Sequence, residues 1–171
     1  LGYIASVSNL YLKKLLEMFF VQDADFIAKF KVHSAAKSVH HGFIGGLLEH
    51  TLSVTKLCDY YAANYECINR DLLITAAIFH DIGKIQEIAP FPVNDYTDDG
   101  QLLGHIFIGA QKISAAAAGI PDLRSCIEDR GISGSSACTV EALYPCTSRR
   151  TGIRFTEEAV PDRGCCTEYG G

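Results

Sequence analysis

A histidine followed directly by an aspartate, His80-Asp81, lies at the end of a strongly apolar run. Leu73, Ala76 and Ala77 follow helical spacing, and their stripe reaches the histidine one turn later, so the imidazole is predicted to face the interior. A buried imidazole and a buried carboxylate each need a partner, and a divalent cation satisfies both. The competing interpretation is a satisfied core histidine with Asp81 as a helix cap.

Two further histidines lie beside predicted buried helix faces. His50 adjoins an apolar stripe that consists of Leu48, Leu52, Thr55 and Cys58. His105 borders a second stripe that consists of Leu102, Ile106, Gly109 and Ile113. Metal sites in helical bundles are built from side chains of facing helices, so three helices with one histidine each favour such a site. Taken singly, each histidine would be assigned to the core or to the surface.

Together these motifs resemble the HD superfamily of metal-dependent phosphohydrolases, which is named for the His-Asp pair. The motifs are HHGFIGGLLEH at residues 40–50, HDIGK at 80–84, YTDDGQLLGH at 96–105 and HIFIG at 105–109. Their order and spacing are most similar to the HD domain of the YhaM-type bacterial 3′-to-5′ exoribonucleases, over residues 9–113. The resemblance therefore implies an all-α fold, the HD-domain helical bundle.

The resemblance also implies a metal site and its ligands. These would be His50, His80, Asp81 and His105. The implied cofactor is a divalent metal, manganese by family, although iron, cobalt, nickel or zinc would suit the same ligand types. One or two such ions would activate water for attack on a phosphodiester.

Catalytic roles are implied for Asp81 and Lys84, with Lys84 also binding substrate by facing the phosphate. Without the family, Lys84 would be interpreted as a helix C-terminal lysine interacting with the dipole. His41 is the second expected phosphate-binding residue. Its alternative is a solvated loop histidine.

The C-terminal part of the chain departs from the family pattern, which continues with a histidine pair and a last ligand aspartate. No histidine follows His105, all eight lysines occur by Lys112, and six of the seven arginines occur from Arg124 onward. We therefore predict a partial HD domain at residues 1–120 and an atypical tail at 121–171. The tail is either translated from a shifted reading frame or is a genuine, poorly structured extension. Leu1 in place of methionine is consistent with a fragment.

Composition limits the class of protein. The chain has 171 residues, 48% of them hydrophobic, which suffices for one domain with a sizeable core. No apolar run reaches membrane-spanning length and no signal peptide is apparent, so we expect a cytoplasmic protein without membrane contact. The net charge of −5 argues against binding of nucleic acid by bulk charge alone. The seven cysteines include no repeated Cys-x-x-Cys motif, so we expect their thiols to stay reduced.

Helices are predicted at residues 9–20 with Ser8 as cap, from a cap at Asp23 to about 30, and at 46–64, 71–81 and 101–118. Prolines, acids and a glycine predict a loop at 90–100, long enough to border a site. The tyrosines at the end of the third helix are expected to pack rather than to form a stacking platform: Tyr60, Tyr61 and Tyr65.

Two classes of function follow. The first is a metal-dependent phosphodiesterase, the HD domain of an exoribonuclease whose partner in the intact protein is single-stranded RNA or DNA. A small-molecule nucleotide or cyclic-dinucleotide phosphohydrolase is an alternative within this class, because the His-Asp site does not choose the substrate. The second class is a truncated, non-catalytic HD module. Missing C-terminal helices would expose core surface and favour oligomerisation or another partner contact.

Overall fold

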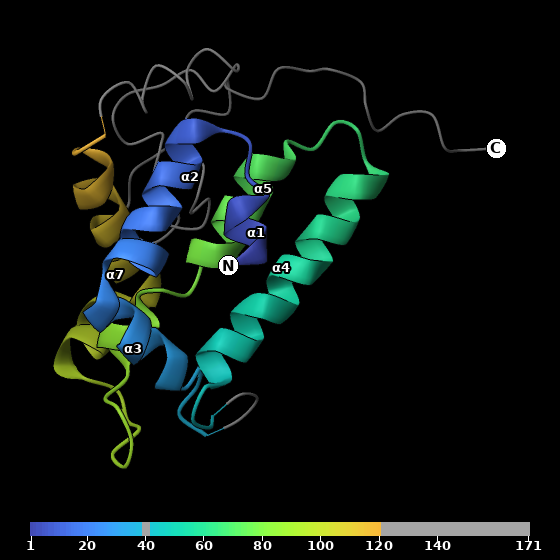
Figure 1. Cartoon of the computed structure of the whole chain (residues 1–171). Helices are drawn as coiled ribbons and strands as arrows, with labels where there is room; N and C mark the ends of the chain where they lie inside the picture. Colours follow the sequence, from blue (N-terminus) through green and yellow to red (C-terminus); the bar gives the residue numbers. More distant parts are fainter. Residues whose placement is uncertain (39–41, 121–171) are drawn as a thin grey trace, which may run out of the picture.

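The computed structural model describes residues 1–38 and 42–120, which form a helical bundle (Figure 1). No β-strand occurs in these two ranges, where the one β-type contact is an isolated antiparallel bridge between Ile88 and Tyr96. The all-α fold class is therefore confirmed. The helices are α1 (Gly2–Ala5), α2 (Leu10–Glu17), the π-helical η1 (Met18–Gln22), α3 (Ala24–Val32), α4 (Gly46–Asn64), α5 (Arg70–Phe79), α6 (Lys84–Glu87) and α7 (Asp98–Ala117).

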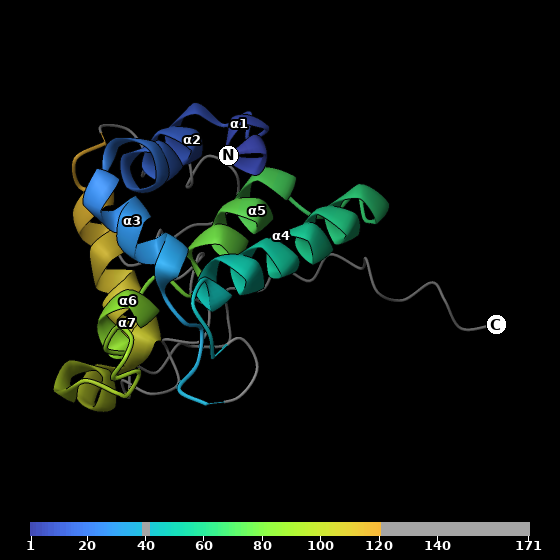
Figure 2. The same ribbon diagram turned by 60° about the horizontal axis from the view of Figure 1, so that its bottom comes forward.

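Helix α5 lies in the middle of the bundle, with α4 on one side and α2 and α7 on the other (Figures 1 and 2). The core between them contains fully buried side chains from α2, α4, α5, α7 and the turn after α5, among them Leu15, Leu16, Leu47, Ile74, Phe79, Ile82 and Ile113. Among the described helices, none combines the length and the apolar character needed to cross a membrane. Helix α5, which leads into the His-Asp pair, thus has helices on both sides.

Polar side chains fix where the helices begin. The Asn9 carboxamide accepts hydrogen bonds from the backbone N–H groups of Tyr11 and Leu12 at the start of α2. The predicted cap at Ser8 is therefore wrong, and the reason is tertiary: the N–H groups of Ser8 and Asn9 both donate to the Asp71 carboxylate of α5, at 3.0 and 2.8 Å. The predicted cap at Asp23 is confirmed by its bond to the Phe26 N–H.

Helix boundaries follow the prediction closely at α4 and less closely elsewhere. The predicted helix at 46–64 is confirmed. The first predicted helix is α-helical only to Glu17 and then widens into η1. Helix α5 ends at Phe79, so His80 and Asp81 occupy the turn after the helix rather than its last turn.

Two predicted buried stripes are partly wrong. On α4 the buried residues are Gly46, Leu47, Thr51 and Thr55, whereas Leu48 and Leu52 are 43% and 41% exposed. Because α4 has apolar residues around most of its circumference, periodicity alone could not select the face that packs on α3 and α5.

Helix α7 does not keep one apolar stripe along its length. Gly104 has a left-handed backbone (φ 75°, ψ 156°), which breaks the helix into two segments. The periodicity predicted across this kink therefore fails, and Leu102 is 82% exposed while Gly109 and Ile113 are buried. Only glycine adopts this conformation without strain.

The three tyrosines expected to pack are instead exposed. Tyr60, Tyr61 and Tyr65 keep 64%, 45% and 54% of their surface accessible at the end of α4. Their rings contact one another in sequence, with centroids 6.0 and 6.2 Å apart. The prediction for this cluster is therefore wrong.

The loop between α6 and α7 was predicted at 90–100 but ends earlier, because Thr97 caps α7 and the helix begins at Asp98. This loop is bound to the segment that follows α3. Asn94 donates its amide hydrogens to the carbonyls of Ala36 and Lys37, at 3.3 and 2.8 Å, and accepts a hydrogen bond from the Ser34 hydroxyl. Lys37 and Asp95 add an ion pair of 2.7 Å. These contacts hold together two segments that are far apart in the sequence.

Gly83 permits the closest approach between the His-Asp turn and α7. A Cβ atom at this position would lie 2.0 Å from the His105 carbonyl oxygen and 2.8 Å from the Gly109 nitrogen. Both are backbone atoms, so they cannot move aside independently of α7. The absence of a side chain at Gly83 thus sets the distance between Asp81 and His105.

We expect Gly83→Ala to lower the free energy of unfolding by about 1–3 kcal/mol, the usual range for overpacking. Urea unfolding followed by circular dichroism would measure the change. Gly2→Ala is the matched control, because a Cβ atom at Gly2 would meet nothing within 4 Å. Equal unfolding midpoints for the two variants would contradict the proposed close contact.

Candidate metal centre

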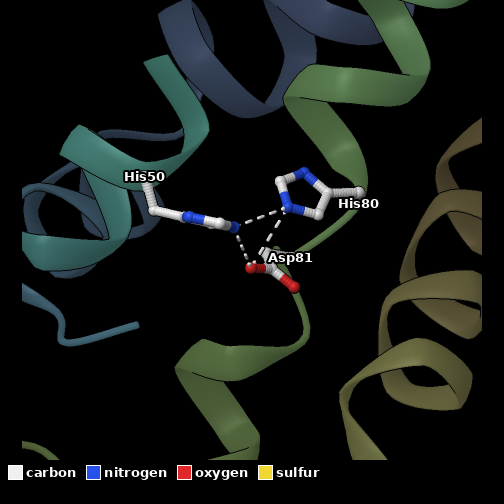
Figure 3. A group of neighbouring side chains, drawn as sticks. All are labelled: His50, His80 and Asp81. Carbon is white, nitrogen blue, oxygen red and sulfur yellow. Dashed lines mark hydrogen bonds and ion pairs between the residues drawn. The ribbon is translucent and has the colours of Figure 1, made fainter. Parts of the chain in front are cut away.

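Four side chains from three parts of the bundle converge on one point. His50 comes from the second turn of α4, His80 and Asp81 from the turn after α5, and His105 from α7 directly after its kink. Figure 3 shows His50 reaching across from α4 toward His80 and Asp81. The structure thus brings together all four residues predicted as metal ligands.

Three of the donor atoms form a nearly equilateral triangle. His50 Nε2 and His80 Nε2 are 3.2 Å apart, and they lie 3.3 and 3.2 Å from Asp81 Oδ2. Ligand bonds of about 2.0–2.2 Å place neighbouring donors roughly 3.0–3.5 Å apart in octahedral or tetrahedral coordination. The triangle therefore fits a shared divalent cation.

His105 approaches the other oxygen of the same carboxylate. Its Nε2 lies 3.4 Å from Asp81 Oδ1, so the two oxygens of Asp81 contact different histidines. His105 is not part of the triangle of mutually close donors. Asp81 is the residue that links the two groups.

Hydrogen bonds at the opposite ring nitrogens orient two of the imidazoles. His80 Nδ1 lies 2.7 Å from the Ala77 carbonyl oxygen, and His105 Nδ1 lies 2.9 Å from Glu87 Oε1. Both partners are acceptors, so each Nδ1 carries the proton and donates. In the neutral ring, Nε2 then keeps a lone pair that a cation shared with Asp81 could accept, which is the usual arrangement of histidine ligands.

Lys84 lies at the edge of this group. Its ammonium is 3.2 Å from Asp81 Oδ2 and donates a 2.7 Å hydrogen bond to the Ala35 carbonyl, with 17% of the side chain exposed. Ala35 lies two residues after His33. The Nε2 atom of His33 contacts the Lys84 carbonyl oxygen at 2.9 Å. Lys84 therefore ties the segment after α3 to the centre, in addition to the phosphate contact predicted for it.

The surroundings of Asp81 favour its ionised form. Burial by itself raises the pKa of this carboxyl group, but the hydrogen bond and charge of His80 and the charges of Lys84 and His105 outweigh burial and lower the pKa to about 2. Burial lowers the pKa of the His80 imidazole, while its contact with Asp81 raises it, and the net direction is upward. The centre thus holds a full negative charge among nitrogen donors.

The site contains one residue that the sequence motifs do not predict, and one predicted residue lies outside the described part of the chain. Glu87, which is 8% exposed, binds His105 and was not predicted. The sequence signal for it was Gly104 next to His105, because a glycine inside a helix pattern marks a break that another group must cap. His41, the second predicted phosphate-binding residue, lies outside the described residues.

The comparisons with known proteins agree with this geometry. Residues 47–127 match the family model described as HD domain. This stretch of the chain is therefore similar to an HD domain, the family that the sequence motifs indicate. Among solved structures, none matches the chain significantly.

The similar proteins include bacterial ribonucleases named 3′-5′ exoribonuclease YhaM. The protein from Bacillus subtilis (strain 168) is 40% identical over 90 residues, which are 53% of this chain and 29% of that protein. The protein from Geobacillus sp. (strain WCH70) is 37% identical over 115 residues, which are 67% of this chain and 32% of the Geobacillus protein. The chain thus spans about a third of the length of these relatives.

We expect metal to stabilise the wild-type chain and to have little effect on His80→Ala, which lacks one corner of the triangle. Ligand that binds only the folded state adds about 2.7 kcal/mol at roughly one hundred times its dissociation constant. The measurement is urea unfolding of each protein in EDTA and in manganese or zinc.

For each protein, the difference between the free energies of unfolding in metal and in EDTA reports metal binding, because a change in packing affects both values equally. Gly2→Ala serves as control and should gain as much stability from metal as the wild type. Equal gains for wild type and His80→Ala would exclude His80 as a ligand.

Proposed function

We propose that the chain contains the metal-dependent phosphodiesterase domain of a 3′-to-5′ exoribonuclease. The observation that carries the proposal is the triangle of His50, His80 and Asp81 at 3.2–3.3 Å, with His105 on the second carboxylate oxygen. The relatives are named as exoribonucleases, which supports RNA as the substrate class. Single-stranded DNA is a second proposed substrate, because hydrolysis of a phosphodiester does not by itself require a 2′-hydroxyl.

In this proposal the four ligands hold one or two divalent ions, with manganese as the proposed metal. Bound there, the metal supplies Lewis-acid activation of the phosphodiester and lowers the pKa of water. Asp81 is proposed as a catalytic residue because it stays ionised and contacts every other ligand. The buried apolar residues on either side of the turn, Phe79 and Ile82, hold this carboxylate in place.

Substrate contacts are proposed for Lys84 and His41. An ammonium has three donors, and in Lys84 one is used by Ala35 and a second lies toward Asp81. The third is proposed to meet a phosphate oxygen, where it would offset charge that develops in the transition state. His41 is proposed to donate to the same phosphate.

A non-catalytic HD module is the second candidate. The observation that favours it is the composition break: no histidine follows His105, and arginine replaces lysine in the last part of the chain. We propose residues 1–120 as a partial HD domain, followed by an atypical tail at 121–171. Such a module would bind metal without turnover.

The test uses the full chain on a 5′-labelled single-stranded RNA with manganese. We expect a ladder of products shortened from the 3′ end, and loss of this activity by at least a hundredfold in Asp81→Asn, which removes the charge shared by the ligands. Single-stranded DNA, mononucleotides and a cyclic dinucleotide are tested in parallel.

The control is Asp99→Asn, which removes an exposed carboxylate outside the cluster and should leave the rate within twofold of wild type. Cleavage of the cyclic dinucleotide alone would replace the exonuclease assignment. Stoichiometric metal binding with no turnover of any of these compounds would favour the non-catalytic module.

A further inference from the structure

Within residues 1–38 and 42–120, Glu87 is the one buried carboxylate beside the centre that is not among the proposed ligands. It is 8% exposed and lies at the end of α6. Its Oε1 accepts two hydrogen bonds from one residue, the backbone N–H of His105 at 3.0 Å and the ring Nδ1–H of His105 at 2.9 Å. A single oxygen thus fixes both the backbone and the ring of a proposed ligand.

The kink in α7 creates the need for this contact. Gly104, with φ 75°, interrupts the helix directly before His105, so the His105 N–H starts a new helical segment without an intrahelical acceptor. The Glu87 carboxylate takes the place of that acceptor and also places negative charge at a helix start, where the dipole favours it. The hydrogen bond that caps the helix and the hydrogen bond to the His105 ring therefore depend on the same carboxylate oxygen.

The main chain of Glu87 is held as firmly as its side chain. Its carbonyl oxygen accepts a 2.9 Å hydrogen bond from the Thr97 N–H, and a Cβ atom at Gly100 would lie 2.2 Å from the same oxygen. The first segment of α7 therefore packs directly on Glu87, while the second begins at its carboxylate. This double attachment gives the carboxylate a fixed position relative to His105.

Asp81 lies on the opposite side of the His105 ring. Its Oδ1 is 3.4 Å from His105 Nε2, and Glu87 Oε1 is 2.9 Å from Nδ1, so the imidazole lies between two carboxylates. A carboxylate that accepts the Nδ1 proton selects the tautomer with a lone pair at Nε2. Without that acceptor, the proton can reside on Nε2, where it would block a metal ion.

We propose that Glu87 is the positioning residue of the centre, which fixes the Nδ1–H tautomer and the ring orientation of His105 and so prepares Nε2 to bind metal. The inference rests on the metal site of the proposed function. It assigns Glu87 no contact with substrate. Partners of this kind commonly contribute ten- to hundredfold to metal affinity.

The first measurement concerns the metal-free full chain, so it is independent of metal binding. Histidine ring nitrogen-15 shifts report which nitrogen carries the proton, and His105→Gln identifies the His105 signals. We expect the Nδ1–H form of His105 in the wild type and in the control Asp99→Asn, and a shift toward the Nε2–H form in Glu87→Ala. An unchanged tautomer in Glu87→Ala would overturn the proposal.

The second measurement is manganese affinity by titration calorimetry. We expect Glu87→Ala to bind ten- to hundredfold more weakly and Glu87→Gln to lose less, because the carboxamide keeps an acceptor oxygen but not the charge. If Glu87→Ala does not fold, Glu87→Met, which keeps the length of the side chain but has no carboxylate acceptor, carries both measurements. Wild-type affinity in Glu87→Met together with an unchanged tautomer would then reject the proposal.

A negative result in one measurement can be distinguished from a negative result in the other. A wild-type chain that binds no metal would contradict the proposed function, while the tautomer comparison would still decide the role of Glu87. A purely structural role for Glu87 would lower the unfolding midpoint of Glu87→Ala in EDTA without changing the His105 tautomer. That result would also overturn the proposal.

Discussion

The arrangement of the bundle depends on one buried ionised carboxylate. Asp81 is 4% exposed, and burial of a charge is unfavourable unless nearby groups compensate it. Its compensating contacts come from His50 on α4, His80 in the same turn, Lys84 on α6 and His105 on α7. Displacement of any of these elements would leave a charge that is only partly compensated, so helix packing and site chemistry constrain each other.

Apolar packing holds the carboxylate from the other side. Phe79 and Ile82, which flank the His-Asp pair, are both fully buried, and Phe79 contacts the ring of Phe19 at 5.2 Å. The turn therefore cannot rotate to expose Asp81 without removing two large side chains from the core. Gly83 completes the constraint, because α7 occupies the space where a side chain would be.

The helical fold and the four candidate ligands could be predicted from the sequence, the fold from strong local signals and the candidate ligands from the resemblance to the HD superfamily. Helix caps and apolar periodicity define α3, α4 and α5, and the His-Asp pair with two further histidines defines the centre. The exposed faces of α4 and α7 were misassigned because α4 is apolar on several sides and Gly104 breaks the period of α7. Glu87 was missed because its partner is 18 residues away and meets it only through that kink.

The contacts of Asn94 have a consequence for motion near the centre. This residue joins the loop before α7 to residues 34–37, and the Lys37–Asp95 pair adds to the connection. Two of these four contacts are hydrogen bonds to backbone carbonyls and two join side chains, so neither segment can separate from the other without breaking several bonds at once. We therefore expect the two segments to open as one cooperative unit, with amide hydrogens that exchange with solvent at a shared opening free energy.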